Sequence, residues 1–129
     1  MNQLFNIEDK CYALSGGTGT LGGSIATYLV ENGARVILLG RSANKLDAKC
    51  EELNAIKAGS ATSFLVDVLH EQELIEVRNK IAKEHDRLDG LINLAGGNVP
   101  GATLNEKQSI FDLKLEDTKK VIDINLYGT

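Results

Sequence analysis

Hydrophobic residues fall into four short runs, separated by longer stretches in which apolar and polar residues are mixed. The runs lie at 11–15, 36–39, 63–66 and 91–95. Apolar runs of about four to eight residues are typical of strands that other structure covers. The run Val36-Ile37-Leu38-Leu39 is apolar at every position, which predicts a strand buried on both faces, as in a parallel sheet.

The stretches between the runs carry apolar residues at the spacing of one helix face, which predicts three helices. Asn32-Gly33 predicts the end of the first helix, because glycine tolerates the left-handed cap, and Ser42 predicts an N-cap for the second. A turn is expected at Leu88-Asp89-Gly90. The predicted buried positions are Leu21, Ile25 and Leu29, then Leu46, Cys50 and Leu53, then Leu74, Val77 and Ile81.

A polar, glycine-containing loop from Gly96 to about Lys107 follows the fourth run, and a last helical pattern comes after it. Alternating strands and helices of these lengths predict an α/β fold, in which a parallel sheet is built with right-handed crossovers. We therefore expect a doubly wound parallel sheet, truncated after the fourth strand and part of the following helix, where the chain stops at Thr129. The apolar positions of that last helix are Val121, Ile122, Ile124 and Leu126.

Composition and charge narrow the class of protein. The length of 129 residues suits one domain, 1–129, and a formal net charge of -4 without a basic run argues against a nucleic-acid partner. No apolar stretch approaches the roughly 18 residues of a membrane span, and residues 1–10 lack the apolar part of a signal peptide, so no membrane partner and a cytoplasmic location are expected. Cys11 and Cys50 have no partner at metal-ligand spacing, so we expect reduced, buried side chains and no metal site.

The segment SGGTGTLGGS at 15–24 holds five glycines directly after the first predicted strand. Glycine costs backbone entropy, so this cluster indicates that something approaches the main chain closely. The spacing G-x-G-x-x-G runs from Gly17 to Gly22 between a predicted strand and a predicted helix, a context in which helix amides bind a pyrophosphate. The absence of a following Gly-Lys-Ser/Thr excludes a P-loop. A tight turn without a ligand is the alternative.

The sequence resembles the short-chain dehydrogenase/reductase superfamily, which has a Rossmann-like fold. Ser15–Gly22 is similar to its T-G-x-x-x-G-x-G motif, although Thr20 replaces the middle glycine and Gly19 stands one position earlier. Asn93–Gly96 resembles its N-x-A-G motif, and Asp67-Val68 resembles its adenine contact. Asn125 is similar to the asparagine among the four catalytic residues of the family. The resemblance implies that the cofactor-binding residues are Ser15, Gly16, Thr18, Gly19, Thr20, Leu21, Gly22, Asp67, Val68, Asn93, Ala95 and Gly96.

Three strings, GGTGTLGG, NLAGGNVP and FDL, resemble D-mannonate oxidoreductases (fructuronate reductases) of the short-chain type. This resemblance implies an NAD(P)-dependent oxidoreductase that interconverts a sugar acid, as small-molecule substrate, and its keto form. It also implies a homo-oligomer, because such enzymes associate through a pair of helices. The polar residues Asn98 and Pro100 are candidates for lining a substrate pocket, with a plain loop as the alternative, and His70 and His85 are expected to be solvated and without a catalytic role.

The end of the second predicted strand bears on the choice between NAD and NADP. Dinucleotide folds often place an acid there to bind the ribose hydroxyls, but this chain has Leu39-Gly40-Arg41-Ser42. The Arg41 guanidinium can pair with a 2′-phosphate, which favours NADP and predicts that Arg41→Ala weakens NADPH binding more than NADH binding. A solvated or adenine-stacking Arg41 is the alternative. The mannonate-type resemblance points instead to NAD, so both cofactors stay open.

The resemblance also implies a catalytic tyrosine with a lysine four residues later, but Tyr12 is followed at that spacing by Gly16 and Tyr28 by Asn32, and Tyr127 lies at the end of the sequence. None of the three is expected to be the catalytic tyrosine. Asn125 is then the one catalytic residue present, with a solvent-facing polar residue as the alternative. We expect the chain to be the cofactor half of a longer enzyme and inactive alone, or else a truncated, non-catalytic dinucleotide-binding module. A sheet cut after its fourth strand has an open edge, so we expect marginal stability or association.

Overall fold

The computed structural model describes residues 5–129, which form two compact units. The first ends at Leu94, and the second comprises Ala95–Thr129.

The first unit is built on a four-stranded parallel sheet with the order β3-β2-β1-β4. Its strands are β1 (Cys11–Ser15), β2 (Arg35–Gly40), β3 (Ala61–Leu65) and β4 (Gly90–Asn93). Central strand β1 pairs in register with β2, Leu14 opposite Leu38, and with β4, Ser15 opposite Asn93. The predicted α/β fold with a doubly wound parallel sheet is confirmed.

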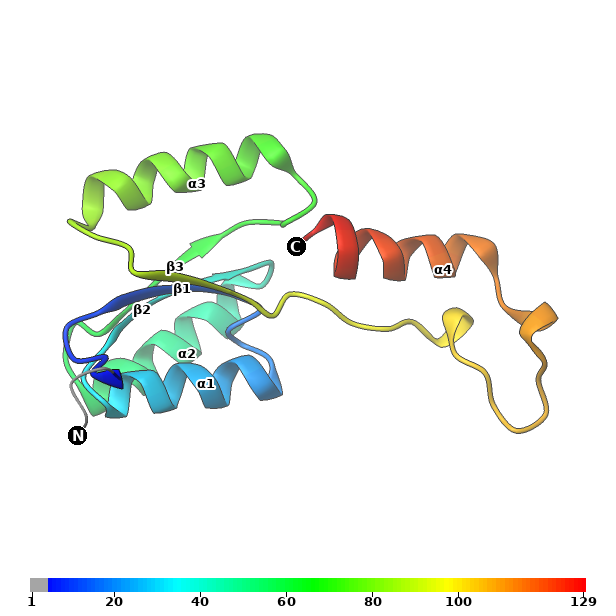
Figure 1. Cartoon of the computed structure of the whole chain (residues 1–129), viewed down its shortest axis with the longest axis horizontal. Helices are drawn as coiled ribbons and strands as arrows, with labels where there is room; N and C mark the ends of the chain where they lie inside the picture. Colours follow the sequence, from blue (N-terminus) through cyan, green and yellow to red (C-terminus); the bar gives the residue numbers. More distant parts are fainter. Residues whose placement is uncertain (1–4) are drawn as a thin grey trace. The chain divides into compact units, whose positions relative to one another are not determined.

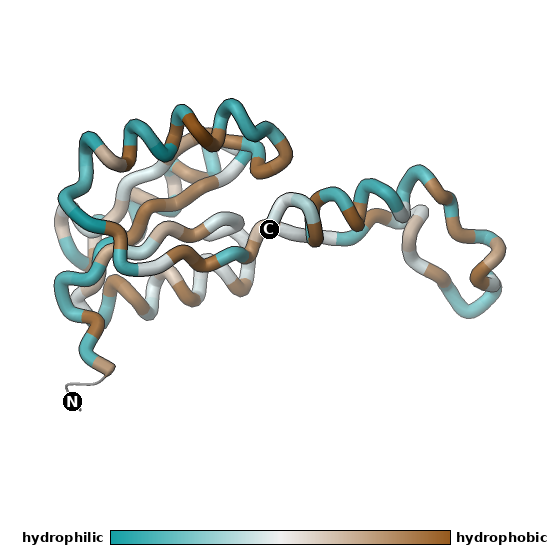
Figure 2. Tube along the Cα trace, turned by 45° about the horizontal axis from the view of Figure 1, so that its top comes forward, coloured by the Kyte–Doolittle hydropathy of each residue, from teal (hydrophilic) through white to brown (hydrophobic). Residues whose placement is uncertain are grey.

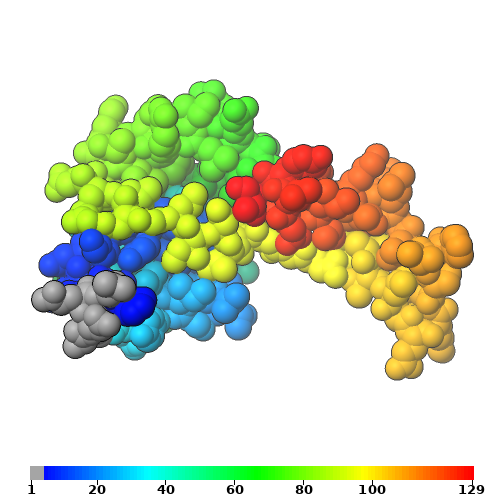
Figure 3. All heavy atoms as spheres, viewed as in Figure 1, coloured from blue at the N-terminus to red at the C-terminus, as the bar shows by residue number. Residues whose placement is uncertain are grey.

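Three helices cover the two faces of this sheet: α1 (Thr20–Glu31), α2 (Ala43–Ile56) and α3 (Glu71–Glu84). Figure 1 shows α1 and α2 on one face and α3 on the other. Figure 3 shows the same layers in space-filling form, with the green atoms of α3 and the light-blue atoms of α1 on opposite sides. The helices change face where the order of strands reverses, between β1 and β4, which makes the carboxyl ends of these two strands the switch point of the sheet.

The alternation of side chains along β1 and β2 divides the core between the two faces. Leu14, Val36 and Leu38 pack with α1 and α2 in one cluster, while Ala13 and Ile37 belong to the cluster under α3. All five are at most 2% exposed, so the prediction of strands covered on both faces is confirmed. Figure 2 shows α3 as largely hydrophilic with hydrophobic residues at intervals, as expected for a helix with one buried side.

The predicted buried face of α1 is wrong at its first position. Leu21 is 66% exposed, and the helix buries Gly22 and Ala26 instead, together with Leu29 and Val30. Small residues at these two positions let the helix axis come close to the sheet, and this turns the neighbouring Leu21 towards solvent. The predicted helix end is confirmed, because Asn32 is the C-cap and Gly33 has a φ of 89°.

The predicted N-cap of the second helix is confirmed, whereas the predicted starts of two strands shift in the structure. Ser42 is the N-cap of α2, yet no side-chain capping hydrogen bond forms there in the described part of the chain. Strand β3 begins at Ala61, where the side chain of Asn54 donates to the Ala61 carbonyl oxygen (3.0 Å) and accepts from its amide (2.9 Å). Strand β4 begins at Gly90, which was predicted as a turn residue, because Gly90 already pairs with Tyr12 of β1. The ring of Tyr12 lies where a side chain at position 90 would be.

The second unit contains two single 3-10 turns and a longer helix. The turns are η2 (Pro100–Ala102) and η3 (Ile110–Asp112), and the helix α4 (Leu115–Ile122) continues into the π-helical turn η4 (Asp123–Tyr127). The predicted last helix is therefore present. Its change to π-helical spacing could not be read from its apolar positions.

Candidate functional site

The loop between β1 and α1 is a tight corner that begins with a glycine in the left-handed region. Gly16 has a φ of 70°, and its amide donates to the carbonyl oxygen of Leu39 (3.0 Å). The Gly19 amide donates back to the carbonyl oxygen of Gly16 (3.1 Å), and Gly19 is the N-cap of α1. The glycine-rich segment is thus a strand-to-helix junction, as its spacing predicts.

The glycines of this corner have different tasks. A Cβ on Gly17 would lie 2.7 Å from Cδ2 of Leu38, and one on Gly22 would collide with the carbonyl oxygen of Gly16. These two positions therefore let the loop and the helix pack closely on the strands. A Cβ on Gly19 would meet only the Gly16 carbonyl oxygen, at 3.4 Å, so this position is open on its other side. The missing side chain of Gly19 leaves room for a ligand to approach the main chain. The missing side chains of Gly17 and Gly22 instead allow close packing within the fold.

The first turn of α1 presents amides that the helix itself does not use. The first helical bond runs from the Gly23 amide to the Gly19 carbonyl oxygen (2.7 Å), so the amides of Thr20, Leu21 and Gly22 precede it. The first turn of α1 contains no acidic residue, and no side chain of the described residues caps it. Free amides and the positive end of the helix dipole together attract anions. The corner therefore has the features of an anion-binding site, and its binding of a diphosphate stays a prediction.

The switch point of the sheet lies beside this corner. Ser15 ends β1, is 4% exposed, and accepts hydrogen bonds from the Leu94 amide at both its carbonyl oxygen (3.1 Å) and its Oγ (3.2 Å). Asn93, the last residue of β4, is paired with Ser15 and is exposed. In open α/β sheets, ligands bind outside the carboxyl ends of the strands at such a point.

An ion pair lies at the carboxyl ends of β2 and β3. Arg41 follows β2, and its Nη1 is 3.7 Å from Oδ2 of Asp67, which follows β3. The Arg41 side chain is 67% exposed and that of Asp67 is 22% exposed. The other carboxylate oxygen of Asp67 accepts from the Leu69 amide (3.0 Å). Two residues that the sequence assigned separately to cofactor binding are therefore in electrostatic contact.

A second carboxylate stands next to Asp67. Glu73 accepts from the Asp67 amide through Oε2 (3.0 Å) and is hydrogen-bonded to Nδ1 of His70 through Oε1 (3.0 Å). The hydrogen bond from the Asp67 amide is the main reason that the pKa of Glu73 is lowered, followed by that from His70. The hydrogen bond with Glu73 raises the pKa of His70, which is the N-cap of α3. These contacts hold the Asp67-Val68 turn in place.

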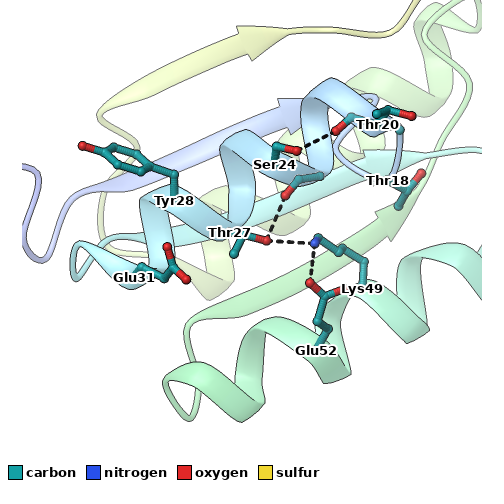
Figure 4. A pocket seen from close by; sticks show the side chains of 10 residues that line it. Thr18, Thr20, Ser24, Thr27, Tyr28, Glu31, Lys49 and Glu52 are labelled. Atoms are coloured by element: carbon teal, nitrogen blue, oxygen red, sulfur yellow. Dashed lines mark hydrogen bonds and ion pairs between the residues drawn. The ribbon is translucent and has the colours of Figure 1, made fainter.

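A groove of about 600 Å³ extends from the glycine corner along α1 and α2 (Figure 4). Thr18 and Thr20 line one end, and Lys49 of α2 reaches in from the side. The Lys49 ammonium is hydrogen-bonded to Oγ1 of Thr27 (2.9 Å) and paired with Glu52 (2.7 Å), and its side chain is 14% exposed. Sequence reasoning missed this contact. The i, i+3 spacing of Lys49 and Glu52 was a signal for their pairing, but nothing pointed to Thr27.

In the second unit, Asn125 anchors a loop. Its Nδ2 donates to the carbonyl oxygens of Gly97 (2.7 Å) and Val121 (2.8 Å), and its Oδ1 accepts from the Gly97 amide (3.2 Å). A Cβ on Gly96 would collide with that Oδ1. Asn125 is exposed, and both ends of its amide also hold main-chain groups, so it has a structural task besides facing solvent. Its catalytic role stays a prediction.

A second hollow of about 560 Å³ lies in the same unit and includes Asn98 and Pro100 among its lining residues. Asn98 donates to Oγ1 of Thr103 (2.8 Å) and accepts from the Val99 amide (2.9 Å). The two candidates for a substrate pocket thus line one hollow.

The first unit brings most of the predicted site residues to one edge of its sheet. The second unit carries the remaining three, and Gly96 and Asn125 are adjacent within it. The residues of the first group are Ser15, Gly16, Thr18, Gly19, Thr20, Leu21, Gly22, Arg41, Asp67, Val68 and Asn93, and those of the second are Ala95, Gly96 and Asn125.

The two cysteines lie inside the fold and take no part in this edge of the sheet. Cys11 is fully buried and Cys50 partly so, and burial raises the pKa of both thiols. Within residues 5–129 there is no group of three or more His, Cys, Asp or Glu side chains able to hold a metal ion. The same residues include no helix that is both long enough and apolar enough to cross a membrane.

The fold, the glycine corner and the switch point together define a dinucleotide-binding α/β unit. The sequence profile of the short chain dehydrogenase family matches residues 10–129, so the chain belongs to this family. The resemblance found in the sequence motifs is thereby confirmed.

Individual relatives agree with this assignment. An uncharacterised oxidoreductase of Haemophilus influenzae is 33% identical over 95% of this chain and 42% of its own length. A crystal structure from Haemophilus influenzae with bound NAD, provisionally described as a D-mannonate oxidoreductase, is 32% identical with a TM-score of 0.84, over 95% of this chain and 47% of that one. A short-chain dehydrogenase/reductase structure from Mycobacterium ulcerans is 26% identical with a TM-score of 0.81, over 96% and 44%.

The chain spans about half the length of the curated relatives that it matches, for example 51% of an uncharacterised oxidoreductase of Staphylococcus saprophyticus and 42% of the Haemophilus protein. The family of this chain is shown, whereas the activity of the whole protein is a proposal.

Proposed function

We propose that this chain binds NAD or NADP at the β1–α1 corner and forms the cofactor half of a short-chain oxidoreductase. The observation that carries the proposal is the set of first-turn amides of α1, those of Thr20, Leu21 and Gly22, which no acidic residue of that turn neutralises. The bound NAD of the Haemophilus structure supports the same class of ligand.

Different residues of this chain hold different parts of the cofactor. The first-turn amides of α1 bind the diphosphate and orient the two halves of the dinucleotide. Arg41 and Asp67 face the adenosine end, because they follow β2 and β3. Asn93 stands at the switch point beside Ser15. When bound, the nicotinamide ring supplies or accepts the hydride that an oxidoreductase transfers.

The proposed reaction of the whole protein is the interconversion of a sugar acid and its keto form, of the D-mannonate and D-fructuronate type. Its support is the resemblance of three short strings and the provisional description of the Haemophilus structure. In this chain, Asn125 would hold the loop at Gly96–Gly97 in the conformation that the reaction needs. A test is to assay the protein translated from the complete reading frame with D-mannonate and either cofactor, with D-gluconate as the matched control substrate.

Titration of the purified chain with NADH and NADPH, followed by calorimetry, tests the binding proposal itself. We expect saturable one-to-one binding of at least one of the two dinucleotides. Binding of neither would overturn the proposal. If binding is present and the complete reading frame lacks a tyrosine followed by a lysine four residues later, the alternative of a non-catalytic dinucleotide-binding module is favoured.

A further inference from the structure

The Arg41–Asp67 pair has a consequence for cofactor choice. Arg41 is the cation at the carboxyl end of β2, where a dinucleotide fold meets the adenosine ribose. Its distance of 3.7 Å from the Asp67 carboxylate is an ion-pair distance and exceeds that of a normal hydrogen bond. With 67% of its side chain exposed, Arg41 keeps most of its donors available to a second anion.

Asp67 is the fixed partner of this pair. Its Oδ1 accepts from the Leu69 amide (3.0 Å), and its own amide donates to Glu73 (3.0 Å). Its side chain is 22% exposed, against 67% for Arg41. The carboxylate therefore stays in place while the long arginine side chain can move. A phosphate that approaches Arg41 must share the guanidinium with a carboxylate that is held by its own turn.

The local balance of charge is unfavourable for a phosphate. Asp67 and the adjacent Glu73 bring two carboxylates to this turn; Arg41 is paired with Asp67, and His70 is paired with Glu73 rather than with the ligand side. A 2′-phosphate adds close to two further negative charges, whereas the 2′-hydroxyl of NAD adds none. Because Asp67 already neutralises part of the charge of Arg41, less of that charge is left to attract the 2′-phosphate of NADP, whereas NAD needs no such attraction.

On the basis of the proposed function, we propose that Asp67 is a specificity-determining residue. By holding Arg41 in an ion pair, it opposes binding of a 2′-phosphate and shifts the preference of the chain from NADP towards NAD. Arg41 attracts the 2′-phosphate and Asp67 offsets that attraction, so the two side chains determine the selectivity together. In the sequence, Arg41 considered by itself predicts a preference for NADP. The ion pair with Asp67 makes that preference weaker.

The test is a double-mutant cycle on the ratio of NADPH affinity to NADH affinity. The four proteins are the unaltered chain, Asp67→Asn, Arg41→Gln and the double variant. Asparagine keeps an oxygen for the Leu69 amide, and any loss of adenine contacts cancels in the ratio because both cofactors contain adenine. We expect Asp67→Asn to raise the ratio about three- to tenfold, in line with the strength of exposed charge pairs acting on a doubly charged group. In the Arg41→Gln background, the same change should leave the ratio within about twofold.

An unchanged ratio in Asp67→Asn would overturn the inference. An equal rise in both backgrounds would also overturn it, because it would show a general effect of charge that does not pass through Arg41. If Asp67→Asn does not fold by circular dichroism, Asp67→Ser replaces it, since the serine hydroxyl can also accept from the Leu69 amide. Failure of the unaltered chain to bind either dinucleotide would instead refute the proposed function, and the inference with it. If the unaltered chain binds a dinucleotide but Asp67→Asn leaves the ratio of NADPH to NADH affinity unchanged, the inference is refuted and the proposed function stands.

Discussion

Gly22 of helix α1 lies directly against the carbonyl group of Gly16, so that a single methyl group on Gly22 would collide with the carbonyl oxygen. This contact closes the β1–α1 corner and sets how near the start of the helix comes to the sheet. The carbonyl belongs to a residue with a φ of 70° that is held on both sides, because its amide donates to Leu39 and its carbonyl oxygen accepts from the Gly19 amide.

The contact predicts a clear loss of stability in Gly22→Ala. Because backbone must shift to admit the methyl group, we expect the free energy of unfolding to fall by about 1–3 kcal/mol. Gly23→Ala is the matched control, since its Cβ would lie at ordinary contact distance from the end of the Lys49 side chain (3.5 Å) and from the Gly17 carbonyl oxygen (3.8 Å). That substitution should leave stability unchanged or raise it by up to about 1 kcal/mol, as expected for alanine in a helix. Urea unfolding followed by circular dichroism measures both, and equal effects would contradict this role of Gly22.

The contacts of the Asp89 carboxylate predict that the free energy of unfolding depends on pH. Its carboxylate accepts from the Cys11 amide (2.9 Å) and from Nε of Arg87 (2.8 Å), and Lys10 lies 3.7 Å away. The hydrogen bond from Arg87, followed by that from the Cys11 amide, lowers the pKa of Asp89. A carboxyl group with a lowered folded-state pKa stabilises the fold above its unfolded pKa of about 3.9, and this contribution is lost as pH falls through the folded pKa.

Asp89→Asn should therefore be less stable than the unaltered chain at pH 7, and the difference should shrink as the pH falls below about 4. Thermal unfolding measured at several pH values from 7 down to about 2 is the test, because the contribution of Asp89 is lost only below its unfolded pKa. A difference that stays constant with pH would show that the effect of Asp89 does not depend on its charge.

The edges of the sheet predict association or marginal stability. Within the first unit, β3 and β4 are the outer strands of the described sheet, and Leu91 on β4 is 58% exposed. An outer strand with apolar residues offers main-chain groups to another chain. We expect sedimentation velocity to show dimers or larger species as concentration rises, or urea unfolding to be broad. Sharp, cooperative unfolding of a clean dilute monomer would contradict this expectation.

Local patterns predicted the elements well where apolar runs were continuous. The residues at 36–39 form the core of β2, and Asn32-Gly33 ends α1. The pattern failed at Leu21, because the close approach of α1 to Gly16 decides which side of the helix is buried. The start of β3 was also missed, because Ala61 and Thr62 are not strongly apolar and Asn54 holds that end.

The candidate site was predictable as a set of positions, whereas its contacts were not. The glycine corner follows from spacing alone, yet the division of labour between Gly17, Gly19 and Gly22 depends on which backbone atoms lie nearby. Arg41 and Asp67 are far apart in the sequence, and only the pairing of β2 with β3 brings their loops together. The hydrogen bonds between Asn125 and Gly97 likewise join two residues that are far apart in the sequence.

The most direct test of the central claim is calorimetric titration of Gly19→Asp with the dinucleotide that the unaltered chain binds. Aspartate suits an N-cap, and Gly19 has an extended backbone, so this variant should fold at least as well as the unaltered chain. Its carboxylate would occupy the place of the diphosphate and repel it. Gly19→Ser is the matched control, with a cap of similar size and no charge.

We expect at least about a tenfold loss of dinucleotide affinity in Gly19→Asp, while Gly19→Ser keeps most of the affinity. Undiminished binding by Gly19→Asp would contradict the claim that the first turn of α1 holds the diphosphate.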